Sequence, residues 1–366
     1  DTIGSRPAGS EAESRASVYL AGLFGEMGLC VDIQRFHFLN WMPLEVPVLN
    51  VLEPVAMKIP CAPMAFTLAT SPSGIEGDVL KIGEALLQFG NIRRQKYTLV
   101  HEGEEVAFFL KGGNEEASTF PSGSPFVQMP GVIVGARDVE RYVEPWLSGT
   151  QKVRMRLTNR CVQEMASSQN VIAYMGEGAP KIVICAHYDG VYNSPSANDN
   201  ASGVEMLFRL ARKLIKISRT PDFPGVAFIC FGCEELKFNG SSHYVRNLQE
   251  HNALESIEYV VNLDMVAAGN EIAIGAGNGM EVFVEKVRKE MGGDIKSRII
   301  VEGVKPTSDH WAFHESGIAT AEFTCWPYAY YHQVTDSLDR LDPMMMRETE
   351  MLAFALVKQL LKEVTK

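Results

Sequence analysis

Short runs of apolar residues followed by polar side chains recur through the second half of the chain. Three of these runs occupy residues 182–185, 226–231 and 259–261. Runs of this length predict strands that are buried on both faces. In an open α/β sheet, ligands bind beyond the carboxyl ends of such strands. The pattern therefore predicts an α/β fold with a mostly parallel core sheet, and chemistry gathered along one edge of that sheet.

Three amphipathic segments predict helices that cover this sheet. The first occupies residues 11–27 and ends at Gly28, which acts as a helix stop. The second begins after Asp199 and Asn200, which are expected to cap it, and the third follows Pro343. Their apolar positions recur at helical spacing and are, in chain order, Ala16, Leu20, Leu23 and Met27; Val204, Leu207, Phe208, Ala211, Leu214 and Ile215; and Leu352, Leu356 and Leu360.

Residues 48–155 have a different pattern. They consist of short β runs broken by proline and glycine, such as 106–110 and 131–135. This part of the sequence contains no cluster of metal-binding residue types. We therefore expect a discontinuous catalytic domain, residues 1–47 and 156–366, that is interrupted by an inserted β-rich domain.

Five short segments place acid–base or metal-binding side chains at the predicted element boundaries. They are His187-Tyr188-Asp189, residues 198–203, Glu234-Glu235, residues 262–265, and Tyr331-His332 followed by Thr335-Asp336. Taken alone, a histidine or aspartate at such a position is more often a helix cap or a polar group with an ordinary hydrogen-bond partner. Two adjacent glutamates often lie in the solvent-exposed first turn of a helix. Together they supply the nitrogen and oxygen donors that zinc binds. The ordered set indicates a hydrolase with a pair of divalent metal ions.

The charges of the candidate ligands suit two such ions. The ligands are His187, Asp199, Glu235, Asp264 and His332. With ionised carboxylates and neutral imidazoles, they carry three negative charges against four positive ones, and a bridging hydroxide neutralises the remainder. Each metal can then take one histidine and one terminal carboxylate, with one aspartate shared. Glu234 is left over beside a ligand and suits a general base.

The same segments resemble metallopeptidase family twenty-eight, the di-zinc aminopeptidases. The family pattern runs H-x-D, G-A-N-D-N-A-S-G, E-E, N-x-D-M and Y-H-x-x-x-D, and the resemblance covers residues 156–366. Residues 3–10 also resemble the N-terminal lead-in of the family. The resemblance implies a zinc-exopeptidase type of fold, in which helices sandwich the sheet, and a protease-associated-like domain at 48–155.

The resemblance also implies a role for each site residue. His187 and Asp264 would hold one of two zinc ions. Glu235 and His332 would hold the other, and Asp199 would bridge both. Glu234 would be the general base, Tyr331 would help to hold the developing oxyanion, and Asp189 would orient His187.

Three details concern how closely the chain follows that pattern. Residues 236–241 depart from the usual Gly-Leu-x-Gly-Ser, which bears on the wall of the substrate pocket and so on specificity rather than on the reaction. Residues 265–269 form a turn that is one small residue longer than usual. The family often has a cis peptide after the bridging aspartate, which is expected here between Asp199 and Asn200.

Composition limits the class and the partners. The chain has 366 residues, of which 46% are hydrophobic and 22% charged, which is typical of a globular protein with one large or two unequal domains. A net charge of −11 argues against nucleic acid or an anionic membrane as the main partner. Seven cysteines, an odd number, favour reduced thiols and a cytoplasmic enzyme. Secretion with removal of a leader is the alternative.

We therefore expect a di-zinc exopeptidase that acts on peptides through a metal-bridging hydroxide. An aminopeptidase is favoured, because cations that could hold a substrate carboxylate are scarce: the segment after the base offers one, Lys237, and residues 187–203, 262–269 and 308–318 contain no arginine or lysine. The alternatives are a carboxypeptidase or dipeptidase of the same fold, a glutaminyl-cyclase-like acyl transferase with one zinc, and an inactive binding relative. Side-chain specificity and oligomeric state are left open.

Overall fold

A computed structural model of the chain describes residues 3–87, 92–120, 127–149, 151–218 and 223–366. The chain divides into two compact units. Unit 1 comprises Asp1–Phe38, Ser167–Tyr330 and Thr335–Lys366, and unit 2 comprises Leu39–Ala166 and Tyr331–Val334. Among the described residues, no helix combines the length and the apolar character needed to cross a membrane.

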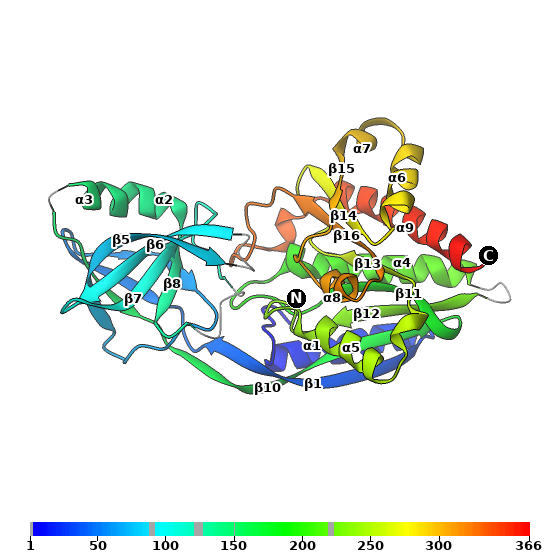
Figure 1. Ribbon diagram of the computed structural model, residues 1–366, viewed down its shortest axis with the longest axis horizontal. Coiled ribbons are helices and arrows are strands. Elements are labelled where there is room, and N and C mark those ends of the chain that lie inside the picture. The colour runs from blue at the N-terminus through cyan, green and yellow to red at the C-terminus, as the bar shows by residue number, and fades with distance from the viewer. Residues whose placement is uncertain (1–2, 88–91, 121–126, 150, 219–222) are drawn as a thin grey trace. The chain divides into compact units, whose positions relative to one another are not determined.

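Unit 1 is built on an eight-stranded sheet with the order β1-β10-β12-β11-β13-β16-β14-β15 (Figure 1). The strands are β1 (Cys30–Pro43), β10 (Cys161–Met175), β11 (Glu177–His187), β12 (Pro224–Phe231), β13 (Tyr259–Leu263), β14 (Glu271–Gly277), β15 (Ile299–Gly303) and β16 (Ala319–Trp326). The central strands β12, β11, β13 and β16 are parallel to one another. Antiparallel pairing occurs where β10 meets β12 and where β14 meets β16. The predicted α/β class with a mostly parallel core is confirmed.

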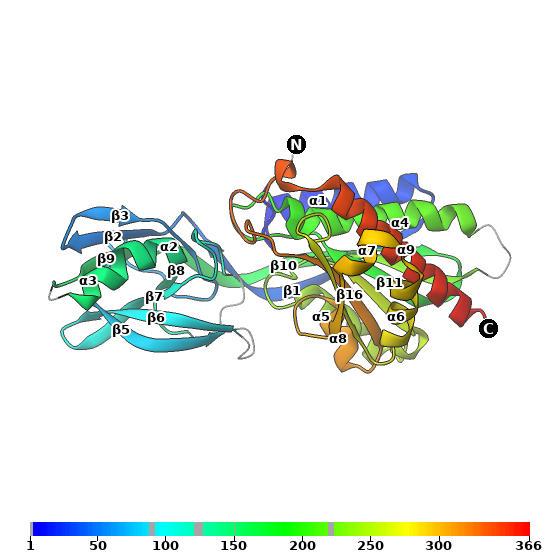
Figure 2. The same ribbon diagram turned by 90° about the horizontal axis from the view of Figure 1, so that it is seen from above.

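Helices cover both faces of this sheet. They are α1 (Glu11–Glu26), α4 (Gly203–Ile217), α5 (Asn239–Glu250), α6 (Glu281–Glu290), α7 (Gly293–Arg298), α8 (His310–Glu315) and α9 (Pro343–Val364). Figure 2 shows α1, α4 and α9 on one face and α5 and α8 on the other. Side chains of β11 alternate accordingly: Ile182 and Ile184 pack in the core beneath α1, α4 and α9, whereas Val183 and Cys185 pack beneath α5 and α8. Burial on both faces explains why the strand reads as a continuous apolar run.

The first helix differs from the sequence prediction in one detail. Ser10 caps α1, because its side chain accepts a hydrogen bond from the Glu13 amide. The buried row is Ala16, Leu20 and Phe24. These residues are four apart and follow one ridge of the helix. Leu23 and Met27, which the sequence analysis placed on the stripe, are only partly buried because they lie beside that ridge.

Unit 2 contains a second eight-stranded sheet with the order β3-β2-β9-β5-β6-β7-β8-β4. Its strands are β2 (Val48–Glu53), β3 (Met57–Ile59), β4 (Cys61–Pro63), β5 (Ile75–Leu87), β6 (Ile92–His101), β7 (Glu104–Lys111), β8 (Gly131–Val134) and β9 (Arg154–Thr158), and its short helices are α2 (Ala136–Asp138) and α3 (Glu144–Ser148). Tyr97 and Phe109 stack in its core with ring centroids 4.9 Å apart.

The limits of unit 2 lie outside the predicted insert at both ends. The insert was expected at 48–155, whereas unit 2 runs from Leu39 to Ala166 and also takes in Tyr331–Val334. Two long strands account for the difference at the ends. Both β1 and β10 continue through a unit boundary, so no turn or change in composition marks those boundaries in the sequence.

Candidate metal centre

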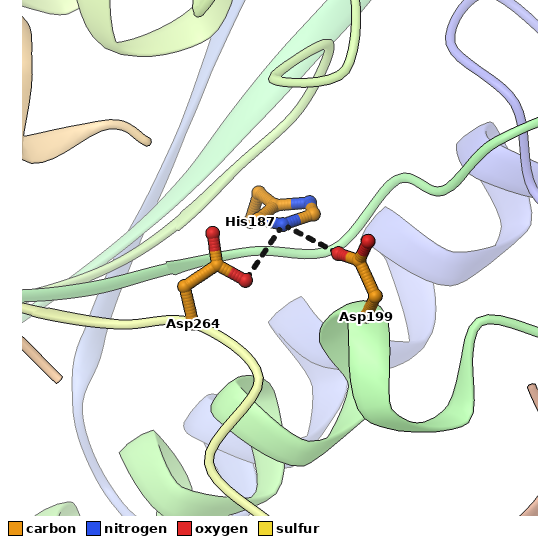
Figure 3. A group of neighbouring side chains, drawn as sticks. All are labelled: His187, Asp199 and Asp264. Atoms are coloured by element: carbon orange, nitrogen blue, oxygen red, sulfur yellow. Dashed lines mark ion pairs between the residues drawn. The ribbon is translucent and has the colours of Figure 1, made fainter. Parts of the chain in front are cut away.

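The site begins at His187, the last residue of β11, whose side chain is buried. Its Nε2 atom lies 3.3 Å from Oδ1 of Asp199 and 3.4 Å from Oδ1 of Asp264, as Figure 3 shows. Its Nδ1 atom lies 3.5 Å from Oδ1 of Asp189. Since Nδ1 faces Asp189, Nε2 is the nitrogen directed at the two other aspartates. The structure thus brings together three predicted ligands from three separate segments of the sequence.

Asp199 is held through its backbone. It lies in the segment Ala197–Ser202, between β11 and α4, and its peptide bond to Asn200 is cis, as expected. The buried carboxylate of Asp336 accepts hydrogen bonds from the amides of Asn198 (2.9 Å) and Asp199 (3.1 Å). These bonds fix the backbone and leave the Asp199 side chain to point at His187.

Asp264 follows β13 in a loop that side chains of the Asn-Asp-Asn-Ala-Ser segment hold in place. Asn200 Nδ2 donates to the Leu263 carbonyl (2.9 Å), and Asn200 Oδ1 accepts from the Met265 amide (3.2 Å). Asn198 and Ser202 accept from the next amides along that loop. The polar residues that flank Asp199 therefore fix the distance between the two aspartates. Asn200 Oδ1 also accepts from the amide of Gly203, the first residue of α4, although the N-cap residue of that helix is Ser202 rather than the predicted Asp199 or Asn200.

Asp189 connects the histidine with the two glutamates. Its Oδ1 accepts from the Glu234 amide (3.0 Å) and its Oδ2 from the Glu235 amide (3.3 Å). The sequence had suggested only that Asp189 orients His187. The structure shows a second task, because the same carboxylate holds the backbone that carries Glu234 and Glu235.

Tyr331 and His332 belong to the short segment that groups with unit 2. Within that unit, Asn114 Nδ2 donates to the Tyr331 carbonyl (3.2 Å), and the Thr119 amide donates to the His332 carbonyl (3.0 Å). His332 Nδ1 lies 3.1 Å from the Thr119 carbonyl oxygen. A carbonyl can only accept, so Nδ1 carries the proton in this contact.

The buried charges in unit 1 perturb one another. Burial lowers the pKa of His187, but the charges of Glu234 and Asp264 and the contacts with Asp189 and Asp199 outweigh it, so the pKa lies well above its usual range. Burial is the main cause that raises the pKa of Glu234 well above its usual range. His187 opposes that rise, and Glu235, Asp264 and Asp309 add to it. Both shifts have the same meaning: the surrounding carboxylates favour the protonated form of each group, and so favour added positive charge between them.

The donor set fits a metal ion. The ligand atoms of His187, Asp199 and Asp264 lie within 4.8 Å of one another, and all three residues are buried. Among the described residues, neither Nε2 of His187 nor Oδ1 of Asp264 has a hydrogen-bond partner. Buried polar atoms are rarely left in that state, and a coordinated cation would satisfy them. One imidazole with carboxylates is a donor set that zinc commonly takes.

The sequence assigns no role to two residues that contribute to this site. Asp336 was recognised only as the end of a motif, although it anchors Asn198 and Asp199. Its hydroxyl donor, Tyr328, was not singled out, although Tyr328 donates to Asp336 Oδ1 at 2.5 Å. The position of Asp336 at the end of the Y-H-x-x-x-D motif is the sequence feature that points to it. We see no local signal for Tyr328.

A buried histidine–carboxylate cluster at the carboxyl edge of a mostly parallel sheet defines a metal-dependent hydrolase of the α/β class. The comparisons make the assignment specific: the chain belongs to peptidase family M28, whose model matches residues 170–357. Aminopeptidase YwaD of Bacillus subtilis is 27% identical, over the whole of this chain and 83% of its own length.

Solved structures share the fold. BSAP, a zinc aminopeptidase from Bacillus subtilis, superposes with a TM-score of 0.73 at 25% identity, over 98% of this chain and 92% of its own. A peptidase M28 precursor from Shewanella amazonensis has a TM-score of 0.76 at 16% identity, over 98% of this chain and 90% of its own, which shows the fold alone. These findings confirm the predicted zinc-dependent peptide hydrolase, with relatives that are named aminopeptidases.

Proposed function

We propose that the protein is a di-zinc aminopeptidase that removes the N-terminal residue of peptides. The observation that carries the proposal is the buried group of His187, Asp199 and Asp264, whose donor atoms converge at the carboxyl edge of the sheet. Membership of peptidase family M28 and the zinc aminopeptidases among its relatives support the reaction and the metal.

In this proposal His187 and Asp264 would hold one zinc ion, and Asp199 would also serve a second. Glu235 and His332 would complete the second site, as the resemblance of their motifs to the family implies. The bond between His332 Nδ1 and the Thr119 carbonyl supports this role, since metal-ligating histidines commonly have one ring nitrogen held by such an acceptor. Zinc bound there would polarise the scissile carbonyl and lower the pKa of a water molecule.

The remaining residues act around the reacting atoms. Glu234 takes the proton from the attacking water and delivers it to the leaving amine. Its Oε2 lies 3.9 Å from His187 Nε2, so it borders the donor group without being needed in it. Tyr331 helps to hold the charge that develops on the carbonyl oxygen. Asp189 fixes the His187 ring and the backbone of both glutamates relative to one another through the contacts described above.

Recognition of a free N-terminus follows from the charge around the donors. Carboxylates dominate the segments that form the site, and a substrate ammonium is attracted to them. A carboxypeptidase would need a cation with free donors to hold the substrate carboxylate. Arg6 is a nearby cation, but its guanidinium donates to backbone carbonyls of Gly4, Tyr188, Pro195 and Ser196. It is therefore occupied in holding the loop and is not placed to receive a substrate.

Unit 2 is proposed to be a protease-associated-like domain that covers the site or guides substrate. Its β-rich sheet and its place as an insert between two parts of the catalytic chain support that interpretation. It supplies the contacts of Asn114 and Thr119 to the Tyr331–Val334 segment, which is a structural reason for an enzyme to retain it.

The test compares three forms of one peptide: unmodified, acetylated at its N-terminus, and amidated at its C-terminus. Release of the first and of the last amino acid is followed separately by mass spectrometry. We expect the unmodified and amidated peptides to be cleaved at similar rates and the acetylated peptide to resist cleavage. Cleavage of the acetylated peptide together with resistance of the amidated one would instead indicate a carboxypeptidase. Cleavage of none, with zinc bound, would indicate an inactive relative.

A further inference from the structure

Arg6 lies outside every segment that was assigned a chemical role, yet its side chain reaches the loop that carries the metal donors. The residue is only 8% exposed. Its Nε donates to the Tyr188 carbonyl, and Nη1 and Nη2 donate to the carbonyls of Pro195 and Ser196, each at 2.9 Å. A buried guanidinium requires such acceptors, because its donors cannot be left without partners.

These carbonyls belong to the connection between two metal-binding residues. Tyr188 follows His187 directly, and Ser196 comes three residues before Asp199. The connection is not a helix or a strand, so its shape depends on side-chain contacts. The Gly190 amide also donates to the Arg6 carbonyl at 3.3 Å, which adds a backbone contact to the same loop. Arg6 thus binds the loop near both of its ends.

Arg6 is itself held in place by the start of α1. The Glu13 carboxylate accepts from the Gly9 amide (2.7 Å) and from the Ser168 hydroxyl of β10 (2.5 Å). Together with the cap at Ser10, these bonds fix the lead-in segment against the sheet. The guanidinium therefore projects from a rigid support rather than from a free chain end.

The charge of Arg6 suits its position. The carboxylates of Asp189, Asp199, Asp336 and Glu235 all act on it, and their attraction opposes the effect of burial on its pKa. A fixed cation beneath these groups reduces their mutual repulsion before a metal arrives. A residue that served only to fill space in the core would not need a charged group that donates to three backbone carbonyls.

We propose that Arg6 is a positioning residue for the metal centre: it fixes the loop 188–196 so that His187 and Asp199 present their donors to the same ion. The inference rests on the proposed function for the identity of that ion. It concerns the geometry of the loop, and it can also be tested without metal.

The experiment compares Arg6→Met, Arg6→Lys and wild type, with Arg15→Met as the matched control on the exposed side of α1. Zinc dissociation constants are measured by competition with a chelator, and the visible spectrum of the Co²⁺-substituted protein reports ligand geometry. Hydrogen exchange of residues 188–199 is measured on the metal-free proteins. Near-ultraviolet circular dichroism establishes folding.

We expect Arg6→Met to bind zinc about 10- to 100-fold more weakly, as loss of a supporting contact to a metal ligand does. Its Co²⁺ spectrum should change and the loop should exchange faster. Arg6→Lys should resemble Arg6→Met more than wild type, because a single ammonium group cannot donate to all the carbonyls that the forked guanidinium reaches. Arg15→Met should match wild type.

Two outcomes would overturn the inference. One is a folded Arg6→Met or Arg6→Lys protein with the zinc affinity, Co²⁺ spectrum and loop exchange of wild type. The other is failure of both variants to fold, since Arg6 would then serve the stability of the whole unit. Absence of zinc binding by wild type would contradict the proposed function instead, and the loop exchange of the metal-free variants would still decide the role of Arg6.

Discussion

Replacement of Glu234 by glutamine tests the division of work between the two adjacent glutamates. Glutamine has the size of glutamate and can still form hydrogen bonds, but it cannot accept the proton of the attacking water. The Glu234 backbone is held through its amide by Asp189, at 3.0 Å, and that contact is unaffected by the side chain. The substitution therefore removes one chemical property and keeps the local geometry.

The size of the effect follows from the position of the carboxylate. Glu234 is 6% exposed and lies at the edge of the donor group, so bulk water cannot replace it as the base. General-base catalysis contributes about 10²- to 10⁴-fold to the rate. At about 1.4 kcal/mol for each factor of ten, Glu234→Gln should raise the barrier by about 3–5 kcal/mol.

The assay measures kcat on a peptide with a free N-terminus, together with zinc content by elemental analysis. Glu250→Gln, at an exposed position at the end of α5, is the matched control and should have wild-type kcat. Glu234→Gln should keep its zinc, whereas Glu235→Gln should lose part of it. A Glu234→Gln enzyme within tenfold of wild type would refute the assignment of the base. Loss of zinc in that variant would show that the glutamates have exchanged roles.

Two further predictions concern stability. Phe24 is fully buried and stacks on Phe208 with ring centroids 4.3 Å apart, so Phe24→Ala should lower the free energy of unfolding, measured in urea, by about 3–5 kcal/mol. Val18→Ala, at a 71% exposed position, should change it by less than about 0.5 kcal/mol. Equal effects of the two substitutions would contradict the packing. Burial is the main cause that raises the pKa of Glu13 from 4.5 to about 8. The folded state therefore holds a proton that the unfolded chain releases, and the free energy of unfolding should fall as pH rises from about 4.5 to about 8, by up to about 1.4 kcal/mol per pH unit. Glu13→Gln should reduce the slope by its own share, because Glu322, whose pKa burial also raises to about 8, still contributes. The exposed control Glu11→Gln should keep the full slope, as urea titrations at several pH values would show. An unchanged slope in Glu13→Gln would mean that Glu13 ionises normally.

The strands of unit 1 could be predicted because burial on both faces leaves an apolar run in the sequence. Helix α9 could be predicted for a similar reason: its leucines at 352, 356 and 360 face the core at a regular period. The buried row of α1 was predicted only in part, because the apolar residues Leu23 and Met27 near its C-terminal end are only partly buried. The limits of unit 2 could not be predicted, because β1 and β10 cross them without interruption.

The grouping of His187, Asp199 and Asp264 could be anticipated because parallel strands bring their carboxyl ends to one edge. That rule places His187 and Asp264 together, and the structure shows both within reach of Asp199. The residues that hold the donors are harder to predict. Arg6 and Asp336 act on backbone carbonyls and amides, and backbone groups look the same in every sequence. Only the folded chain shows which of them these side chains reach.

The most direct test of the account is an anomalous difference map at the zinc absorption edge, from crystals of the zinc-loaded protein. We predict two peaks about 3.5–4 Å apart, the spacing of two-metal hydrolytic sites. One peak should lie between His187 and Asp264, the other between Glu235 and His332, and Asp199 should contact both. A single peak, or a pair that Asp199 does not bridge, would contradict the proposed di-zinc centre.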